Sequence, residues 1–217
     1  MFEVHSFVNS PVISNCYVLF DQTASNECII VDPGSKDEKE LLDYLWKEKL
    51  EPKYIILTHE HFDHCWGVNQ LVEKYNLPIV CSELCADAIK YEKRNCSVFY
   101  DNTEAFSINQ GTISIESLDN ELLLGVYAIR FYNTPGHTDS SISFTIGKFL
   151  FTGDTLLKDV KTVTKLPSGS VYKLIYSMKQ FRSLLGKGYE VLPGHGERFW
   201  LDEYDLEKMI GFVNYEV

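Results

Sequence analysis

The chain has 217 residues, of which 45% are hydrophobic, and its net charge at pH 7 is −11. This length and composition allow one α/β domain with a sizeable core. Twenty basic against 31 acidic residues argue against nucleic-acid binding, which depends on Lys and Arg neutralising phosphates, and against a role at a membrane surface. No apolar run approaches the roughly 18 residues that a membrane-spanning helix needs.

The first half of the chain is expected to begin with an antiparallel meander and then to alternate helices with strands. Apolar and alternating runs predict strands, and apolar residues at helical spacing predict helices. The expected strands cover Phe2–Val8, Asn15–Phe20, Glu27–Val31, Tyr54–Leu57 and Pro78–Cys81, and the expected helices cover Asp37–Lys49, Gly67–Tyr75 and Glu83–Tyr91. The least patterned stretch, Lys93–Asn109, is expected to be a loop or a lid.

The second half repeats this mixture of strands and helices. Strands are expected over Thr112–Glu116, Ala128–Tyr132, Ser141–Ile146, Phe149–Thr152 and Tyr189–Val191, and helices over Val171–Leu185 and Glu203–Val213. Two groups of strands with helices between them predict an α/β fold with two mixed sheets flanked by helices. Because no linker or low-complexity segment divides the chain, we expect one domain over residues 1–217.

Four potential metal ligands lie within six residues, directly after the apolar run over 54–57: His59, His61, Asp63 and His64. His59 and His61 alternate, so they can point the same way if strand geometry persists through them. Asp63 and His64 lie beyond a turn and would aim at a neighbouring point. Imidazole and carboxylate suit zinc, iron and manganese. The segment therefore predicts two adjacent metal positions; the alternative is a polar surface loop that is rich in histidine by chance.

Three later segments each bring one more potential ligand to the end of an expected strand. His137 and His195 each follow a Pro-Gly turn, and Asp154 follows the expected strand over 149–152. Proline restricts one backbone angle and glycine accepts unusual ones, so the two turns are stiff where each histidine leaves them. One histidine at a strand end is commonly structural, but a structural role does not explain four strand ends that all carry His or Asp.

In this order, the motifs resemble those of the metallo-β-lactamase superfamily, and the two Pro-Gly-His turns are most similar to its hydroxyacylglutathione hydrolase (glyoxalase II) branch. The resemblance runs from about Asn15 to Gly196 and implies a four-layer αββα sandwich. It implies that one metal is held by His59, His61 and His137, and a second by Asp63, His64 and His195, with Asp154 bridging the two. It also implies that Asp32 orients a ligand histidine through the other ring nitrogen, where the alternative is a simple turn aspartate.

The resemblance further implies a hydrolase that uses two divalent ions, zinc being preferred over iron or manganese. Bound metal lowers the pKa of water from about 15.7 to about 7, so a metal-bridging hydroxide would attack the carbonyl carbon of an ester-like bond. A thioester of a small molecule is the preferred substrate, and Asp63 would guide the proton.

Val163 and Lys165 stand where small relatives usually carry Arg and Asp; Lys165 is expected to be a solvated surface residue.

Other reactions on the same scaffold remain open. A persulfide dioxygenase would hold a single iron, and a lactonase or β-lactamase would attack a different acyl group. A flavodiiron protein normally has Glu at the position of His61, and a ribonuclease would need a basic surface. A non-catalytic module would be expected to have lost some ligands, whereas all seven are present here.

The six cysteines have no disulfide-framework spacing and are expected to be free thiols in a reducing cytoplasm. No charged-then-apolar signal segment is recognisable at the beginning, which also favours a cytoplasmic location. Cys81 and Cys85 could share a helical face, but a metal site would need a second pair. Cys65 borders the histidine-rich segment, and we expect it to pack in the core and not to bind metal.

Overall fold

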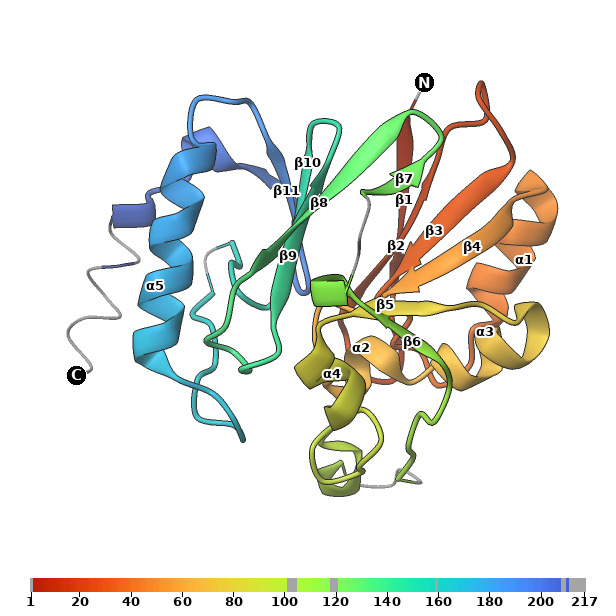
Figure 1. Ribbon diagram of the computed structural model, residues 1–217, viewed down its shortest axis with the longest axis horizontal. Coiled ribbons are helices and arrows are strands. Elements are labelled where there is room, and N and C mark those ends of the chain that lie inside the picture. Colours follow the sequence, from red (N-terminus) through yellow and green to blue (C-terminus); the bar gives the residue numbers. More distant parts are fainter. Residues whose placement is uncertain (1, 101–104, 118–120, 159, 208–209, 211–217) are drawn as a thin grey trace. The chain divides into compact units, whose positions relative to one another are not determined.

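The computed structural model describes all residues except 1, 101–104, 118–120, 159, 208–209 and 211–217 (Figure 1). It divides into two compact units, Met1–Ile129 and Arg130–Val217, which are described in turn. The expectation of one domain over 1–217 stays a prediction. In the part of the chain that the structure describes, no helix has the length and apolar character needed to cross a membrane.

The first unit contains a mixed sheet of six strands in the order β1-β2-β3-β4-β5-β6. β1, β2 and β3 are antiparallel neighbours, as a meander requires, and β3 to β6 run parallel. The strands are β1 (Glu3–Val8), β2 (Asn15–Phe20), β3 (Glu27–Val31), β4 (Glu51–Ile56), β5 (Ile79–Cys81) and β6 (Thr112–Ser114). Because parallel strands end at the same edge of a sheet, the loops after β3 and β4 leave side by side.

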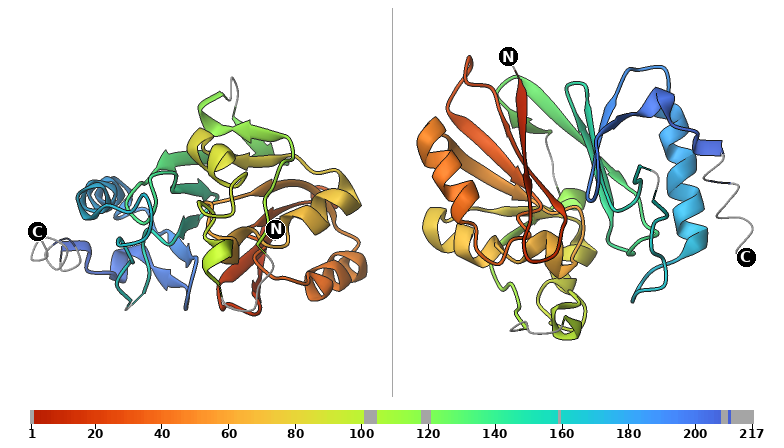
Figure 2. Two further views of the ribbon diagram at one scale, coloured as in Figure 1. Left: turned by 90° about the horizontal axis from the view of Figure 1, so that it is seen from below. Right: turned by 180° about the vertical axis from the view of Figure 1, so that it is seen from behind.

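Helices cover one face of this sheet, where α1 (Lys39–Glu48) and α3 (Val68–Tyr75) lie on the same side in both views (Figure 2). Leu41 and Leu45 of α1 and Leu71 of α3 are buried with alternate strand residues. Both helices end at a residue in the left-handed conformation that closes the last turn. The remaining short helices of this unit are α2 (Phe62–Cys65), α4 (Glu83–Ala88), η1 (Ser97–Phe99) and η2 (Ile115–Ser117).

The second sheet has the order β12-β11-β10-β9-β8-β7 and is also mixed, since only β10 and β11 are parallel. Its strands are β7 (Leu122–Leu124), β8 (Tyr127–Asn133), β9 (Ile142–Ile146), β10 (Phe149–Gly153), β11 (Glu190–Pro193) and β12 (Phe199–Trp200). β8 begins in the first unit, where it pairs with β7, and continues into the second. The predicted α/β class with two mixed sheets is confirmed.

The helix α5 (Val171–Phe181) covers the second sheet and continues as the 3-10 turn η3 (Arg182–Leu184). Leu174, Met178 and Phe181 repeat at helical spacing and are buried with Leu150 of β10 and Val191 of β11. Ser170 precedes the helix, and its side chain accepts a hydrogen bond from the amide of Lys173. This is the capping arrangement that serine favours at a helix start.

Several predicted boundaries are wrong. The helix expected over 83–91 ends at Ala88, and the last turns of the helix expected over 171–185 are 3-10. The short strands β7 and β12 were not predicted, because runs of two or three residues show no periodicity. A 3-10 turn, η4 (Leu201–Glu203), lies at the start of the helix expected over 203–213, and much of that helix lies outside the described residues.

All six cysteines are free, as predicted, and all six are buried. Cys65 belongs to the core of the first unit, and its thiol donates to the Glu60 carbonyl oxygen at 3.3 Å. Burial raises the pKa of Cys65 well above the ordinary thiol value, which keeps it protonated. Cys81 lies in β5 and Cys85 in α4, so the two do not share a helical face.

Glu38 is a buried carboxyl group at the start of α1 that packs against Gly67, and its Oε1 accepts a hydrogen bond from the Ser35 amide at 3.1 Å. Burial raises its pKa from 4.5 to about 8. A raised folded-state pKa means that its contribution to stability is complete below pH 4.5 and is lost as the pH rises through 8.

We therefore expect the unfolding free energy to fall by on the order of 4 kcal/mol across this pH window, and Glu38→Gln to flatten that dependence. Urea unfolding at several pH values measures it. Glu40→Gln, which removes an exposed carboxylate from the same helix, is the control. An unchanged pH slope in Glu38→Gln would show that the buried carboxyl is not responsible.

Candidate metal centre

The ligand loop, residues Thr58–His64, leaves the sheet just after β4 ends at Ile56. Alternation was expected to point His59 and His61 the same way only if they continued the strand. They do not, because both lie beyond the end of β4. The two rings nevertheless lie 4.8 Å apart between centroids, and the ring of His59 lies 4.3 Å from that of His64. The short helix α2 begins after His61 and turns the chain back, so that three buried imidazoles gather in the first unit.

Asp32, in the loop after β3, helps to orient two of these histidines, one by direct contact and one through Thr58. Its Oδ2 contacts His64 Nδ1 at 3.0 Å and accepts a hydrogen bond from the Thr58 hydroxyl at 2.6 Å. That hydroxyl lies 3.0 Å from His59 Nδ1, from which it can accept. Both rings therefore use Nδ1 within the protein, which leaves Nε2 as the nitrogen that could bind a metal. Asp32 makes the contact that the resemblance implied, and the role of Thr58 was not predicted.

Three residues contact the backbone of Asp63: Asn9, Ser14 and Gly34. Its carbonyl oxygen accepts hydrogen bonds from the Ser14 hydroxyl at 2.5 Å and from Asn9 Nδ2 at 3.5 Å. Gly34 lies so close that a Cβ atom added there would be 1.6 Å from this same oxygen. Asn9 and Ser14 were missed at the sequence level, because neither belongs to a pattern that predicts contact with a residue about 50 positions away.

The C-terminal ligand set consists of His137, Asp154 and His195, which follow β8, β10 and β11. β10 and β11 are parallel, and β8 runs in the same direction because β9 is antiparallel to both of its neighbours. All three strands therefore end at one edge of the sheet. The sheet topology brings together three residues that lie far apart in the sequence, as their strand-end positions predicted.

The turn before His137 is tightly constrained. Gly136 has φ +150°, and a Cβ atom added there would lie 2.5 Å from Cα of Leu174 in α5. The Ser177 hydroxyl, also in α5, donates to the Pro135 carbonyl oxygen at 2.6 Å. His137 Nδ1 lies 2.7 Å from the Val163 carbonyl oxygen, so it donates there and presents Nε2. Only the backbone of Val163 makes this contact, so the contact does not depend on the Val163 side chain.

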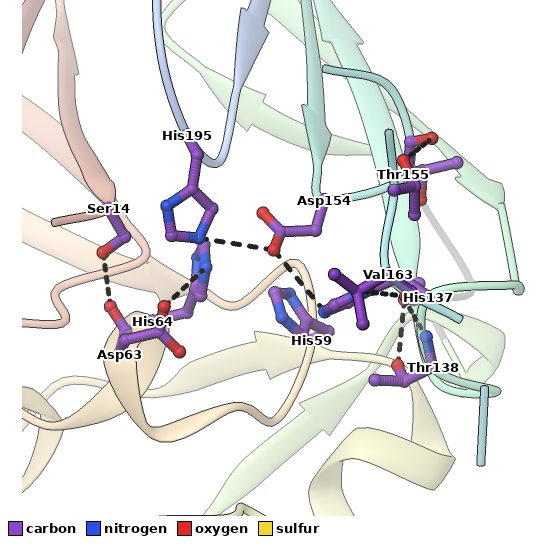
Figure 3. Close-up of polar contacts among 12 residues, drawn as sticks. Ser14, His59, Asp63, His64, His137, Thr138, Asp154, Thr155, Val163 and His195 are labelled. Carbon is purple, nitrogen blue, oxygen red and sulfur yellow. Dashed lines mark hydrogen bonds and ion pairs between the residues drawn. The ribbon is translucent and has the colours of Figure 1, made fainter. Parts of the chain in front are cut away.

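Three histidine–carboxylate distances test whether these residues suit a metal (Figure 3). Nε2 of His64 lies 3.6 Å from Asp63 Oδ2, and Nε2 of His137 and of His195 lie 3.5 and 3.3 Å from Asp154 Oδ2. These distances exceed the usual 2.7–3.2 Å of a hydrogen bond. Two ligands that are each about 2.1 Å from one tetrahedral ion are separated by roughly 3.4 Å. The donor atoms therefore have the mutual spacing of metal ligands.

The family of the chain follows from its match to a family model. The model of the metallo-β-lactamase superfamily matches residues 9–205. The chain belongs to the metallo-β-lactamase superfamily. A probable metallo-hydrolase of Bacillus subtilis is 28% identical over 188 residues, which cover 86% of each chain. A hydroxyacylglutathione hydrolase of Pectobacterium carotovorum is 30% identical over 152 residues, which cover 70% of this chain and 51% of the relative.

Solved structures of the superfamily share this fold. The crystal structure of the B3 metallo-β-lactamase BLEG-1 matches with a TM-score of 0.82 and 25% identity, over 92% of this chain and 94% of that one. The crystal structure of TTHA1623 in a di-iron-bound form matches with a TM-score of 0.76 and 26% identity, over 91% and 94% of the two chains. The predicted fold class, that of the metallo-β-lactamase superfamily, is confirmed.

Proposed function

We propose that the ligand loop and the C-terminal ligand set together hold two divalent metal ions, and that the protein hydrolyses a thioester of a small molecule. Family membership supports a metal-dependent hydrolase, and similarity to hydroxyacylglutathione hydrolases supports the thioester. In this proposal His59, His61 and His137 bind one ion, Asp63, His64 and His195 bind the other, and Asp154 binds both.

The observation that carries the proposal is the position of Asp154. Its Oδ2 lies at nearly equal distances from Nε2 of His137 and Nε2 of His195, 3.5 and 3.3 Å. The superfamily pattern assigns these two histidines to different ions. A carboxylate oxygen with one histidine from each ion beside it has the position that a bridging ligand requires.

Two divalent ions at this site would supply a water nucleophile that is activated at neutral pH and a Lewis acid for the carbonyl oxygen. The protein's contribution is to hold the ligands in one geometry, through the contacts of Asp32, Thr58 and the Val163 carbonyl with ring nitrogens. Asp63 and Asp154 contribute two negative charges against the four positive charges of the ions, so the site retains a net positive charge that favours an anionic nucleophile.

Asp63 is the residue that we propose to guide the proton. Its side chain is 13% exposed, so the carboxylate is not sealed from solvent and can exchange a proton with it. The hydrogen bonds from Ser14 and Asn9 to its carbonyl oxygen hold its backbone in place. A carboxylate that is held firmly beside the nucleophile can accept a proton without a large rearrangement.

The proposed ions are zinc, because the histidine and carboxylate ligands and their near-tetrahedral spacing suit it. Iron and manganese accept the same ligands, and the similar protein TTHA1623 was crystallised with two irons.

The proposed setting is the cytoplasm, which six buried free thiols and the absence of disulfides among the described cysteines support. The acidic net charge favours a small-molecule partner over nucleic acid.

Metal analysis of the purified protein, combined with a panel of thioesters, lactones and β-lactams, tests the proposal. We expect two metal ions per chain, turnover of thioesters in preference to the other classes, and loss of turnover on chelation that readdition of zinc restores. One iron per chain with oxygen consumption on a persulfide would overturn the proposal in favour of a dioxygenase. Turnover that survives complete metal removal would overturn it altogether.

A further inference from the structure

A partly exposed aromatic cluster adjoins the ligand loop in the first unit. It consists of Phe62, Trp66, Tyr100 and Phe106. Trp66 contacts the other three rings, with centroids 5.6, 5.8 and 5.8 Å away. The metal-binding proposal does not use these side chains, all four of which are half-buried.

The positions of Phe62 and Trp66 tie the cluster to the proposed metal ligands. The two residues are four apart along and just beyond α2, so their side chains lie on the same side of that helical turn. They flank Asp63 and His64 in the sequence, and Phe62 directly follows His61. The chain therefore places two half-buried aromatic side chains directly beside candidate ligands of the loop.

Among the described residues, one cation, that of Lys36, lies over this cluster. Nζ of Lys36 is 5.7 Å from the centroid of the Trp66 ring, a cation–π distance. Among the described residues, the ion pairs formed by lysine and arginine do not include Lys36. In a chain with a net charge of −11, a lysine that is held beside an aromatic surface and is not neutralised by a carboxylate is an attractive contact for an anion.

The backbone around Lys36 is fixed relative to the ligand loop. The Lys36 amide donates to the Ser10 carbonyl oxygen at 2.9 Å, and the Pro33 carbonyl oxygen accepts from the Gly67 amide at 2.9 Å. Between them, Gly34 packs against the Asp63 backbone. The segment that begins with Asp32, the partner of His64, therefore holds the backbone of Lys36 close in the chain to residues that pack on the ligand loop.

From this geometry we infer that Lys36 and the aromatic cluster determine substrate specificity. They select small molecules whose apolar or aromatic body carries an anionic group remote from the bond that is cleaved. The rings hold the apolar body, and the ammonium group of Lys36 binds the anion. This inference rests on the proposed function for the reaction, but the binding preference can be measured without turnover.

The experiment compares two acyl groups on the same thiol: a benzoyl thioester and a 4-carboxybenzoyl thioester. For Lys36→Gln we expect kcat/KM to fall about fivefold for the carboxylated substrate, the size of an exposed ion pair, and to be unchanged for the neutral one. Lys36→Glu should lower it about tenfold or more, because attraction becomes repulsion. The loss should shrink in 0.5 M salt, which screens exposed charges.

Lys74→Gln is the matched control. Lys74 also lies over an aromatic ring, that of Tyr75 at 5.6 Å, but at the far end of α3. The substitution Lys74→Gln removes the same charge from a comparable cation–π contact. We therefore expect kcat/KM for both substrates to equal that of the unmodified protein. A fivefold loss in this control would show that net charge, and not the position of Lys36, is responsible.

Calorimetric titration of the metal-loaded protein with terephthalate and benzoate separates the two proposals. Benzoate offers one carboxylate to the metals, and terephthalate offers a second to Lys36, so Lys36→Gln should weaken only terephthalate, about fivefold. If Lys36→Gln weakens only terephthalate but no thioester is turned over, the proposed reaction is wrong and the proposed binding preference is supported. If thioesters are turned over but Lys36→Gln affects the charged and neutral ligands equally, the specificity fails and the reaction stands.

Discussion

Asp154→Asn is expected to lower kcat/KM at least about a thousandfold and to reduce metal content from two ions per chain to one or none. The substitution keeps the size of the side chain but removes its negative charge. In the proposed site Asp154 is the ligand shared by both ions, and its Oδ2 has a histidine nitrogen of each proposed ion within 3.5 Å. Without the charge, two divalent cations would repel each other with no anionic residue between them.

Elemental analysis gives the metal stoichiometry, and steady-state kinetics on the preferred thioester gives kcat/KM. Asp43→Asn, which removes an exposed carboxylate from α1, should change neither. Circular dichroism should show that Asp154→Asn remains folded, since the strands around it are held by the buried core of the second unit. Two ions bound with unchanged affinity in Asp154→Asn would contradict the bridging role.

Gly34→Ala is expected to destabilise the protein by about 3 kcal/mol or more. The added Cβ atom would lie 1.6 Å from the Asp63 carbonyl oxygen and 2.8 Å from Asn9 Nδ2. The obstacle is backbone, so it cannot be relieved by a change of rotamer. The ligand loop must move away from the Asp32 segment, and we expect weaker metal binding in addition to the loss of stability.

Urea unfolding measures the change in stability, and metal titration measures the change in affinity. Gly111→Ala is the control, because a Cβ atom at Gly111 meets nothing within 4 Å. We expect that variant to lie within about 0.5 kcal/mol of the unmodified protein. If Gly34→Ala is as stable as Gly111→Ala, the close packing of the two loops is not essential to the fold.

Much of the fold follows from local pattern. The apolar strands of both sheets and the helices α1, α3 and α5 lie close to their predicted positions, because their periodicity records a face that must be buried. The seven candidate ligands were predicted from their residue types and from the strands that precede them, and their role as ligands stays a prediction. Asp32 was assigned from resemblance, and the structure shows which ring it contacts, that of His64.

The sequence by itself determined the α/β class with mixed sheets, the types of the candidate ligands and the order in which strands deliver them, since these depend on residue identity and short-range spacing, and its motifs carried the resemblance to the family. Only the tertiary structure decided which nitrogen each ring presents, that the Val163 carbonyl orients His137, and that Asn9 and Ser14 hold Asp63. The contacts of Val163 with His137 and of Asn9 and Ser14 with Asp63 join residues 26 to 54 positions apart. Such pairs come together only when strand pairing and core packing have placed the loops, and no local pattern specifies that placement.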